Sequence, residues 1–331
     1  VGLGLILVNL IRPGEGAQLG LSTQAQLGQE SENWLDILRR MVPENVFDAF
    51  TGNGNMLQVI FFALLFGFFI TRAPERPKKI LTDLLDSAFQ VVMLMASWVM
   101  KLVPYGVFCL LVKVVGETGF DVFIPLSTYM LTVVLALVVH AGVVLPLLLS
   151  IVARVSPLKW FRAMSPVLMT AFSTSSSSLT LPTTLNTLKS RGKVSNKTSS
   201  FVAPLGATVN MDGTALYECI GVVFLAQYYA STGDYVLTFG SQVTVVMAAF
   251  LASIGADGVP SAGLIMMLTI LSALKLPLEG AALLLAVDRP LDMCRTMVNV
   301  WSDTVGSAIV ATREGEKGLG DFESPAPTPE S

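Results

Sequence analysis

The sequence predicts an all-α membrane protein with broken helices and two helical hairpins that enter the bilayer from opposite sides. Three observations carry this prediction. Of the 331 residues, 53% are hydrophobic and only 14% are charged, with a mean hydropathy of +0.66, whereas soluble domains carry about 25% charged residues. Basic residues gather between apolar runs and so indicate the cytoplasmic side. Polar segments broken by proline and glycine interrupt the later apolar runs.

The composition also excludes several classes of function. A net charge of −3 argues against a nucleic-acid binder. The only histidine, His140, lies in an apolar run, which argues against histidine metal sites and Ser–His catalysis. Cys109, Cys219 and Cys294 are widely separated in apolar segments and indicate small buried side chains. We therefore expect neither an enzyme nor an organic cofactor.

The first part of the chain consists of apolar runs separated by polar connections. Residues 1–11 reach only about half the length of a membrane-spanning helix, so we expect upstream spanning helices to lie outside this sequence. A polar connection over 12–55 precedes an apolar run at 59–70. The next loop is basic, with Arg72, Arg76, Lys78 and Lys79. By the positive-inside rule this loop is cytoplasmic.

Two further spans are expected. The first covers about 84–115 with an interruption at Pro104, and the connector GETGFD after it has no Lys or Arg, which favours the external side. The second covers about 122–152. It is followed by basic residues, Arg154, Lys159 and Arg162, which return the chain to the cytoplasm.

The segment 164–188 is polar, rich in hydroxyl groups and interrupted by proline, and it contains the run TSSSSLTLP. Both of its flanks are basic, since Lys189, Arg191, Lys193 and Lys197 follow it. A segment that begins and ends on one side is re-entrant, and irregular backbone persists at membrane depth only where protein or water satisfies its polar groups. We therefore predict a hairpin over about 160–195 whose serine tip faces polar surroundings.

The remaining chain predicts a broken helix, a second hairpin and a final helix. The helix over about 199–230 contains GATVNMDGTALYE, with a break at Gly213. A glycine-broken apolar stretch over about 240–275 predicts a hairpin that enters from outside. A last helix over about 280–312 ends at basic residues, and the Glu-, Pro- and Ser-rich tail over 314–331 is typical of a disordered segment. Opposed hairpins with broken helices are typical of inverted-repeat transporters.

Five polar residues recur along the last helix, at spacings of 4, 3, 4 and 4: Asp288, Asp292, Arg295, Asn299 and Asp303. At 3.6 residues per turn they fall within an arc of roughly 80°. Such a stripe cannot face lipid, because an ionised group at mid-bilayer costs about 2.5–3.5 kcal/mol even on the lenient insertion scale. It indicates a ligand or ion path, with an internally neutralised structural network as the alternative.

Polar groups also interrupt the helix over 199–230. Asn210 and Asp212 place amide and carboxylate oxygens where an unwound helix exposes carbonyls, a combination that suits alkali cations. The alternative is an ordinary glycine kink with a buried aspartate ion pair. Glu218 is either a protonatable coupling group or a structural partner of a basic side chain.

Four motifs in order, TSSSSLTLP, PLGATVNMDGTALYE, ASIGADGVP and LDMCRTMVNVWSD, resemble the glutamate/aspartate transporter family of dicarboxylate/amino acid:cation symporters. That family includes excitatory amino acid transporters and neutral amino acid exchangers. The resemblance extends to about Arg313. It implies a sodium-coupled importer of glutamate or aspartate, with proton coupling left open. It also implies a multi-pass protein of the plasma or inner (cytoplasmic) membrane with a cytoplasmic C-terminus.

The resemblance further implies an assembly and a division into domains. The protein would be a homotrimer in the lipid bilayer, and in each subunit a transport domain would slide like an elevator against a scaffold. Residues 1–14 would end helix 3 of the transport domain, and 15–121 would hold an extramembrane loop and scaffold helices 4 and 5. Residues 122–313 would contain helix 6, hairpin 1, helix 7, hairpin 2 and helix 8. The family's first two helices and most of the third would precede this sequence.

The site residues follow from the resemblance position by position. Asp292 would bind the substrate ammonium and Arg295 the side-chain carboxylate, while the serine tip would receive the other carboxylate. The implied substrate-binding residues are Ser176, Ser177, Ser178, Thr214, Gly258, Val259, Asp292, Arg295, Thr296 and Asn299. Glu218 would be the coupling residue.

Three sodium sites are also implied, for ions that are transported. The first would contain Gly206, Asn210, Asn299 and Asp303. The second would contain Thr208, Ser253, Ile254 and Ala256, mostly through their carbonyls. Asn210 and Asp212 would supply half of the third, whose helix 3 partners are not in this sequence.

The chemistry of these residues favours acidic amino acids. The planar fork of Arg295 suits a second carboxylate, and a plain dicarboxylate would leave Asp292 unpaired. The sequence departs from the family at Ser175 and Met293, the two places where relatives carry an additional arginine, and at Asp257, where a small apolar residue is expected. The alternatives are a proton-coupled dicarboxylate or neutral amino acid symporter and an anion-conducting channel.

Overall fold

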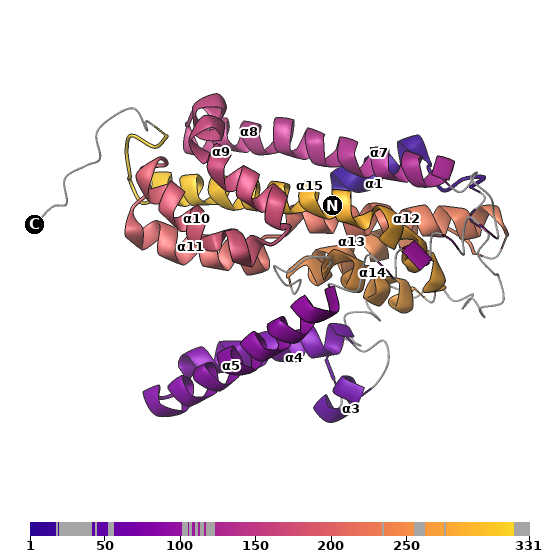
Figure 1. The fold of residues 1–331 in the computed structure, drawn as a ribbon, viewed down its shortest axis with the longest axis horizontal. Coiled ribbons are helices and arrows are strands. Elements are labelled where there is room, and N and C mark those ends of the chain that lie inside the picture. The colour runs from indigo at the N-terminus through magenta and orange to yellow at the C-terminus, as the bar shows by residue number, and fades with distance from the viewer. Residues whose placement is uncertain are drawn as a thin grey trace, which may run out of the picture.

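A computed structural model of the chain describes residues 1–17, 19, 42, 43, 45–51, 56–100, 105, 108, 109, 112, 116, 123–233, 235–254, 262–274 and 276–320. All regular structure in these residues is helical, which confirms the predicted all-α class (Figure 1). The helices are α1 (Gly2–Ile11), α3 (Val46–Thr51), α4 (Met56–Arg72), α5 (Glu75–Met100), α7 (Phe123–Val139), η2 (His140–Val144), α8 (Leu145–Leu148), η3 (Leu149–Ala153), α9 (Pro157–Thr174), α10 (Ser177–Ser190), α11 (Asn196–Val209), α12 (Asp212–Ser231), α13 (Phe239–Ile254), α14 (Ala262–Ala273) and α15 (Glu279–Arg313).

Helix α12 lies at the centre of the bundle. Every residue from Gly213 to Tyr229 is buried, as expected for a helix that is apolar on nearly all sides. It packs against α1, α7, α13, α14 and α15. Small residues allow the closest approach, since a Cβ at Gly14 would lie 2.2 Å from the carbonyl oxygen of Phe224. The connection after α1 is therefore held directly against α12.

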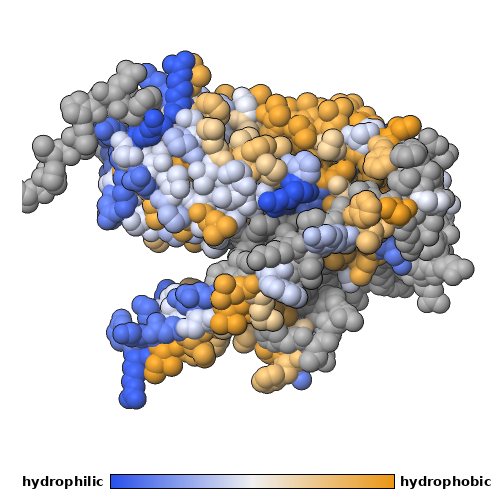
Figure 2. Space-filling view, in the orientation of Figure 1, coloured by the Kyte–Doolittle hydropathy of each residue, from blue (hydrophilic) through white to orange (hydrophobic). Residues whose placement is uncertain are grey.

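The outer surface of the bundle is largely apolar. Figure 2 shows a broad hydrophobic face over α7 and α8, and hydrophilic residues gathered at the end where α9, α10 and the C-terminal segment lie. On α5, Leu94 and Trp98 are 73% and 65% exposed. Within the described residues, Phe123–Ala153 and Asn196–Ser231 are long and apolar enough to cross a bilayer. Contact with lipid explains such an exposed surface better than contact with water.

Helices α9 and α10 form the pair expected over 160–195, although it begins at Pro157 and the second helix ends at Ser190. The two helices pack on each other and on α15, and α10 also packs on α11. They are joined by Ser175, in the left-handed conformation (φ 51°), and by Ser176, whose Oγ accepts a hydrogen bond from the N–H of Leu179. The serine run is thus the turn itself, and its entry into a membrane stays a prediction.

The helix expected over 199–230 is broken, but not at Gly213 as predicted. Helix α11 ends at Val209 and α12 begins at Asp212, while Asn210 and Met211 between them have ψ angles of 68° and 61°. Both residues leave the helical region, so the polar Asn210 stands where carbonyl groups are released from helical hydrogen bonding. Gly213 is inside α12 and serves close packing instead.

Two other predicted segments differ in detail. The span expected over 122–152 contains the π-helical segments η2 and η3, which are frequent at functional sites. Helix α5 begins already at Glu75, before the span expected over 84–115, and Pro104 lies outside the described residues. The second hairpin corresponds to α13 and α14, which pack on each other and on α12. Its tip lies outside the described residues.

Residues 314–320, the first part of the tail that was expected to be disordered, contact the bundle, and 321–331 lie outside the described residues. The Glu316 carboxylate accepts hydrogen bonds from the N–H and Oγ of Ser195, at 2.7 and 2.6 Å, and from Thr198 Oγ1 at 2.6 Å. It therefore caps α11, whose N-terminus attracts an anion. Partial burial raises the pKa of Glu316, but these hydrogen bonds and the nearby Lys197 outweigh burial and hold this pKa below its usual value.

Replacement of Glu316 by glutamine should lower the melting temperature of the purified protein at neutral pH, because an amide is a weaker acceptor than a carboxylate. The difference from wild type should be complete above the pKa of an unfolded glutamate, about 4.3. The difference should disappear as the pH falls through the lower folded pKa, because wild-type Glu316 is then protonated and, like the glutamine, neutral. Melting curves recorded across this pH range test the prediction.

Glu314→Gln is the matched control, because Glu314 forms only an exposed ion pair with Lys197 at 3.5 Å. Such pairs contribute little to stability, so its melting temperature should follow wild type. A Glu316→Gln difference that did not change with pH would contradict the capping role.

Candidate functional site

The polar residues expected on one face of the last helix do share a face of α15, and that face is buried. Asp288, Asp292, Arg295, Asn299 and Asp303 are each at most 4% exposed. Helices α7, α9, α10, α11, α12 and α14 pack on α15. Charged groups in such surroundings cost free energy unless partners neutralise them. The partners of each residue therefore determine what the face can bind.

Arg295 is the cation of this face. One guanidinium nitrogen, Nη2, is ion-paired with Asp292, and Nη1 lies 3.7 Å from Asp288 Oδ1. The guanidinium stacks on Tyr217, with Cζ 4.4 Å from the ring centroid. A Cβ at Gly263 of α14 would lie 2.7 Å from Nη1, so α14 covers this group closely. Nη1 has no hydrogen-bond partner among the described residues, which leaves a buried donor for a ligand.

Arg289 is the basic residue next to Asp288 in the sequence. In the structure Asp288 is paired with Arg295, and Arg289 Nη1 instead lies 3.8 Å from Asp292 Oδ2. One buried arginine thus faces two buried carboxylates, with a half-exposed arginine beside the second. The shared pairing was not visible in the sequence, because Asp288 and Arg295 are seven residues apart, beyond the i,i+3 and i,i+4 spacings at which side chains on a helix are direct neighbours.

Asn299 joins α15 to the first turn of α12. Its Oδ1 accepts hydrogen bonds from the N–H groups of Gly213 and Thr214, at 2.8 and 3.3 Å, and its Nδ2 donates to Thr214 Oγ1 at 3.0 Å. A Cβ at Gly213 would lie 2.9 Å from this Oδ1, so glycine is needed for the contact. Thr214 and Asn299, both predicted to line one pocket, are therefore in direct contact. Thr296 is buried on the same helix.

The Asp303 side chain contacts the non-helical segment between α11 and α12. Asn210 Nδ2 donates to Asp303 Oδ1 and to Ser302 Oγ, both at 3.0 Å. A Cβ at Gly206 would lie 2.5 Å from Asp303 Oδ1, which places α11 close to the carboxylate. The structure thus brings together Gly206, Asn210 and Asp303, whereas the side chain of Asn299, the fourth residue of that predicted sodium site, is turned toward Thr214. Oxygen donors of this kind suit an alkali cation.

Asp212 has a partner that sequence reasoning missed. Its Oδ2 lies 2.5 Å from His140 Nε2, at the start of the π-helical segment η2, and its Oδ1 accepts a hydrogen bond from the N–H of Gly213 at 2.9 Å. The predicted cation ligand is therefore held from two sides. The pairing was missed because the two residues are 72 positions apart and the histidine stands in an apolar run.

The serine turn lies beside α15. Val167 and Ala171 of α9 pack against Val300 of α15, next to Asn299 in the sequence. Ser176 and Ser177 are buried and Ser178 is partly buried at the start of α10. Helix α10 also packs on α15, and the N-terminus of a helix suits an anion.

Glu218 is fully buried in α12, and neither of its carboxylate oxygens has a hydrogen-bond partner among the described residues. The hydroxyl groups of Tyr129 and Tyr217 are buried without such a partner as well. None of the described basic side chains forms an ion pair with Glu218, so the structure does not show the purely structural alternative. An unpaired buried carboxylate is costly, and the neutral acid is easier to accommodate.

The second predicted sodium site is described only in part. Thr208 Oγ1 and Ser253 Oγ each donate to a carbonyl of their own helix, those of Leu205 and Phe250, at 3.1 and 2.8 Å. Ile254 ends α13. Four residues of the predicted hairpin tip lie outside the described residues, Ala256, Asp257, Gly258 and Val259.

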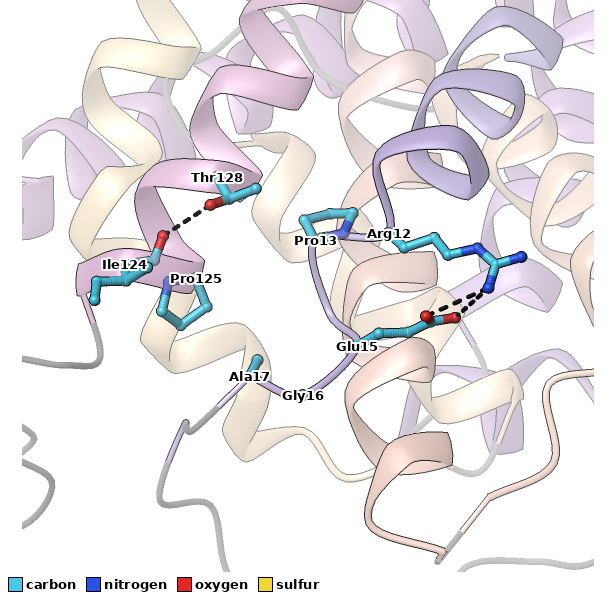
Figure 3. A pocket seen from close by; sticks show the side chains of 8 residues that line it. All are labelled: Arg12, Pro13, Glu15, Gly16, Ala17, Ile124, Pro125 and Thr128. Carbon is cyan, nitrogen blue, oxygen red and sulfur yellow. Dashed lines mark hydrogen bonds and ion pairs between the residues drawn. The ribbon is translucent and has the colours of Figure 1, made fainter.

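The described residues form two notable hollows. The wider one, of about 420 Å³, lies between the end of α1 and the start of α7, and the exposed pair Arg12–Glu15 lines it (Figure 3). It contains no predicted site residue. A groove of about 270 Å³ lies between α8, α11 and α15 and reaches Gly206, Asn210 and Asp303. Among the described residues no three His, Cys, Asp or Glu side chains are grouped to hold a metal ion.

Comparison with known proteins connects this geometry to a family. The model of the sodium:dicarboxylate symporter family matches residues 1–313. Excitatory amino acid transporter 3 of Oryctolagus cuniculus is 40% identical over 257 residues, which cover 77% of this chain and 48% of that protein. Its namesake from Homo sapiens is 34% identical over 360 residues, 93% of this chain and 68% of that protein. The chain spans about half the length of the rabbit relative that it matches.

Replacement of Asn299 by alanine should destabilise the protein, because it leaves the N–H of Thr214 without its acceptor and removes the Nδ2 donor to Thr214 Oγ1, while Gly213 keeps only Asp212 Oδ1. The expected loss is about 1–3 kcal/mol for each buried polar group left unpaired, measured by reversible unfolding of the purified protein. Asn186→Ala on the exposed face of α10 is the control and should change stability by no more than about 0.5 kcal/mol. Equal losses in the two variants would refute the connecting role of Asn299.

Proposed function

Since the chain belongs to the sodium:dicarboxylate symporter family, we propose that it is a sodium-coupled symporter of acidic amino acids, glutamate or aspartate. The observation that carries the proposal is buried Arg295, whose Nη2 is paired with Asp292 and whose Nη1 has no hydrogen-bond partner among the described residues. Relatives are named as excitatory amino acid transporters. The family is one of transporters and not of enzymes.

Arg295 and Asp292 would exchange their mutual ion pair for pairs with the substrate. The substrate ammonium would take Asp292, and the side-chain carboxylate would take the planar fork of Arg295. The other carboxylate would bind the N–H groups and hydroxyls of Ser176, Ser177 and Ser178 at the start of α10. Thr214 would line the pocket. A neutral amino acid would leave Arg295 without an anion, which explains the expected preference.

Sodium ions would bind where oxygen atoms converge around the break before α12. Gly206, Asn210 and Asp303 would hold one ion, with Asn299 supplying a backbone oxygen. Asp212, oriented by His140, would help to hold another with Asn210. A third would bind at Thr208, Ser253, Ile254 and Ala256. The carboxylate and carbonyl donors suit a hard monovalent cation, and no organic cofactor enters the proposal.

The proposed assembly is a homotrimer embedded in the plasma or inner membrane, with the C-terminus in the cytoplasm. Each subunit would move a transport domain, residues 1–14 and 122–313, against a scaffold that holds α4 and α5. The two helical pairs, α9–α10 and α13–α14, would be the re-entrant hairpins that gate the site. Separation of α4 and α5 from the main bundle in Figure 1 supports a distinct scaffold.

Uptake into liposomes tests the proposal. The full-length protein would be reconstituted, and accumulation of radiolabelled aspartate and glutamate would be measured with and without an inward sodium gradient. We expect saturable accumulation only with the gradient. Accumulation that is the same with and without the sodium gradient would refute sodium-coupled symport, as would a non-saturable anion conductance in place of saturable uptake.

Replacement of Arg295 by cysteine should shift selectivity from acidic to small neutral amino acids. The change removes a charge-assisted hydrogen bond to the side-chain carboxylate, worth about 1.5–3 kcal/mol, or roughly a tenfold or greater loss of glutamate affinity. Competition of serine and glutamate against labelled substrate measures this. Arg289→Cys is the matched control and should retain acidic selectivity, and high-affinity glutamate uptake by Arg295→Cys would exclude the assigned role.

Replacement of Glu218 by glutamine tests whether this carboxyl carries a coupled proton. Glutamine imitates the protonated form permanently, so the loaded transporter could still cross while the empty one could not be reset by proton release. The variant should exchange internal for external substrate at a near wild-type rate but lose net, gradient-driven uptake. Both modes are measured in the same liposomes. If exchange and net uptake fall together, Glu218 is a structural residue only.

A further inference from the structure

The groove between α8, α11 and α15 has apolar walls and one polar end. Its volume is about 270 Å³. The walls include Leu145, Leu148, Val202, Leu205, Val305 and Ile309. At its rim Leu148 and Leu205 are 43% and 50% exposed, so the groove opens to the apolar surface of the bundle. At its polar end lie Asn210, Ser302 and Asp303, of which Ser302 and Asp303 are buried and Asn210 is exposed.

No basic side chain among the described residues neutralises the polar end of the groove. Asp303 is only 4% exposed, yet no described Lys, Arg or His forms an ion pair with it. Its carboxylate accepts one hydrogen bond, from Asn210 Nδ2, which also donates to Ser302 Oγ. The Asp303 carboxylate, which accepts this single hydrogen bond, and Ser302 Oγ therefore offer acceptors for a further donor. A primary ammonium has three N–H donors and the complementary charge.

We propose that this groove binds a single-chain primary alkylamine, with the ammonium on Asp303 and the chain along the apolar walls. Because Asp303 is also a proposed sodium ligand, the amine and sodium would compete. The competition rests on the proposed function, whereas binding in the groove does not. Such a compound would inhibit the protein from a site other than the proposed amino acid pocket.

The same features select against related compounds. An alcohol of equal length lacks the charge, and a carboxylic acid would place an anion beside Asp303. A phosphoethanolamine headgroup would place its phosphate a few atoms from the ammonium, between Leu205 and Val305, where no basic side chain lines the groove. The groove is small for a drug-sized ligand, which favours a short chain.

Gly306 provides the means to close the groove. It lines the groove, and a Cβ there would meet nothing within 4 Å. A leucine at this position would extend from that open Cβ position into the groove, and loss of a helix-interior glycine favours α15. Gly306→Ala is the matched control, because it adds the Cβ but leaves most of the volume free.

The test is photolabelling of the full-length protein in liposomes with octylamine that carries a diazirine near the end of its chain. Labelled residues are mapped by mass spectrometry, with octanol carrying the same group as comparison. We expect labelling in 202–209 and 305–309, weak labelling by the alcohol, and at least a tenfold decrease in Gly306→Leu but not in Gly306→Ala. Saturating sodium should suppress labelling, relative to choline.

Chain length gives a second measure. Affinity should rise about three- to fourfold for each added methylene until the groove is full, and then level off. Equal labelling of wild type and Gly306→Leu, or equal labelling by the alcohol, would overturn the inference, since both indicate partition into lipid. Labelling that sodium leaves unchanged would overturn the shared use of Asp303. Groove labelling in a protein without sodium-dependent uptake would refute the proposed function alone.

Discussion

The burial of ionised side chains on α15 is the constraint on which the rest of the structure depends. Each charge on this helix would cost several kcal/mol if it faced lipid, so neighbouring helices must cover the stripe and supply partners. Asp288, Asp292 and Arg295 satisfy one another in part. Asn299 is held by the first turn of α12, and Asp303 by Asn210 at the helix break. The packing of the bundle follows from these requirements.

Glycines occupy the positions at which neighbouring helices approach the polar residues of α15 most closely. A side chain at Gly206 would collide with Asp303, one at Gly213 with Asn299, and one at Gly263 with Arg295. Three helices, α11, α12 and α14, thus approach the stripe at positions where a Cβ is missing. The same close approach limits the room for bound ions and substrate, so binding there requires donors and acceptors already in place.

The sequence predicted the helical class and the polar face of the last helix, because both rest on hydrophobicity and a fixed angular period. It placed the helix break at Gly213, since glycine is the usual signal, but the break falls at Asn210 and Met211. The contact between His140 and Asp212 could not be predicted from the sequence, because pairing between segments 72 positions apart leaves no local sequence pattern. The capping of α11 by Glu316 was not predicted, because the composition of the tail is typical of a disordered segment. The proposed ligand assignments came from the family resemblance and not from periodicity.

The charges of the stripe indicate why uptake of an acidic substrate would require cations. In their ionised forms Asp288, Asp292 and Asp303 carry three negative charges against the single positive charge of Arg295, all in a buried setting. A glutamate or aspartate brings two carboxylates and one ammonium, which makes the site more negative by one. Relatives with a further arginine would offset part of this, but Ser175 and Met293 supply none here. Arg289, near Asp292, is half-exposed and so screened by solvent, which leaves bound sodium as the further source of buried positive charge. Because the electrostatic free energy of a buried site grows steeply with its unbalanced charge, substrate and sodium would each bind weakly without the other. In the proposed function, coupling between the two ligands would then follow from charge balance at one helix.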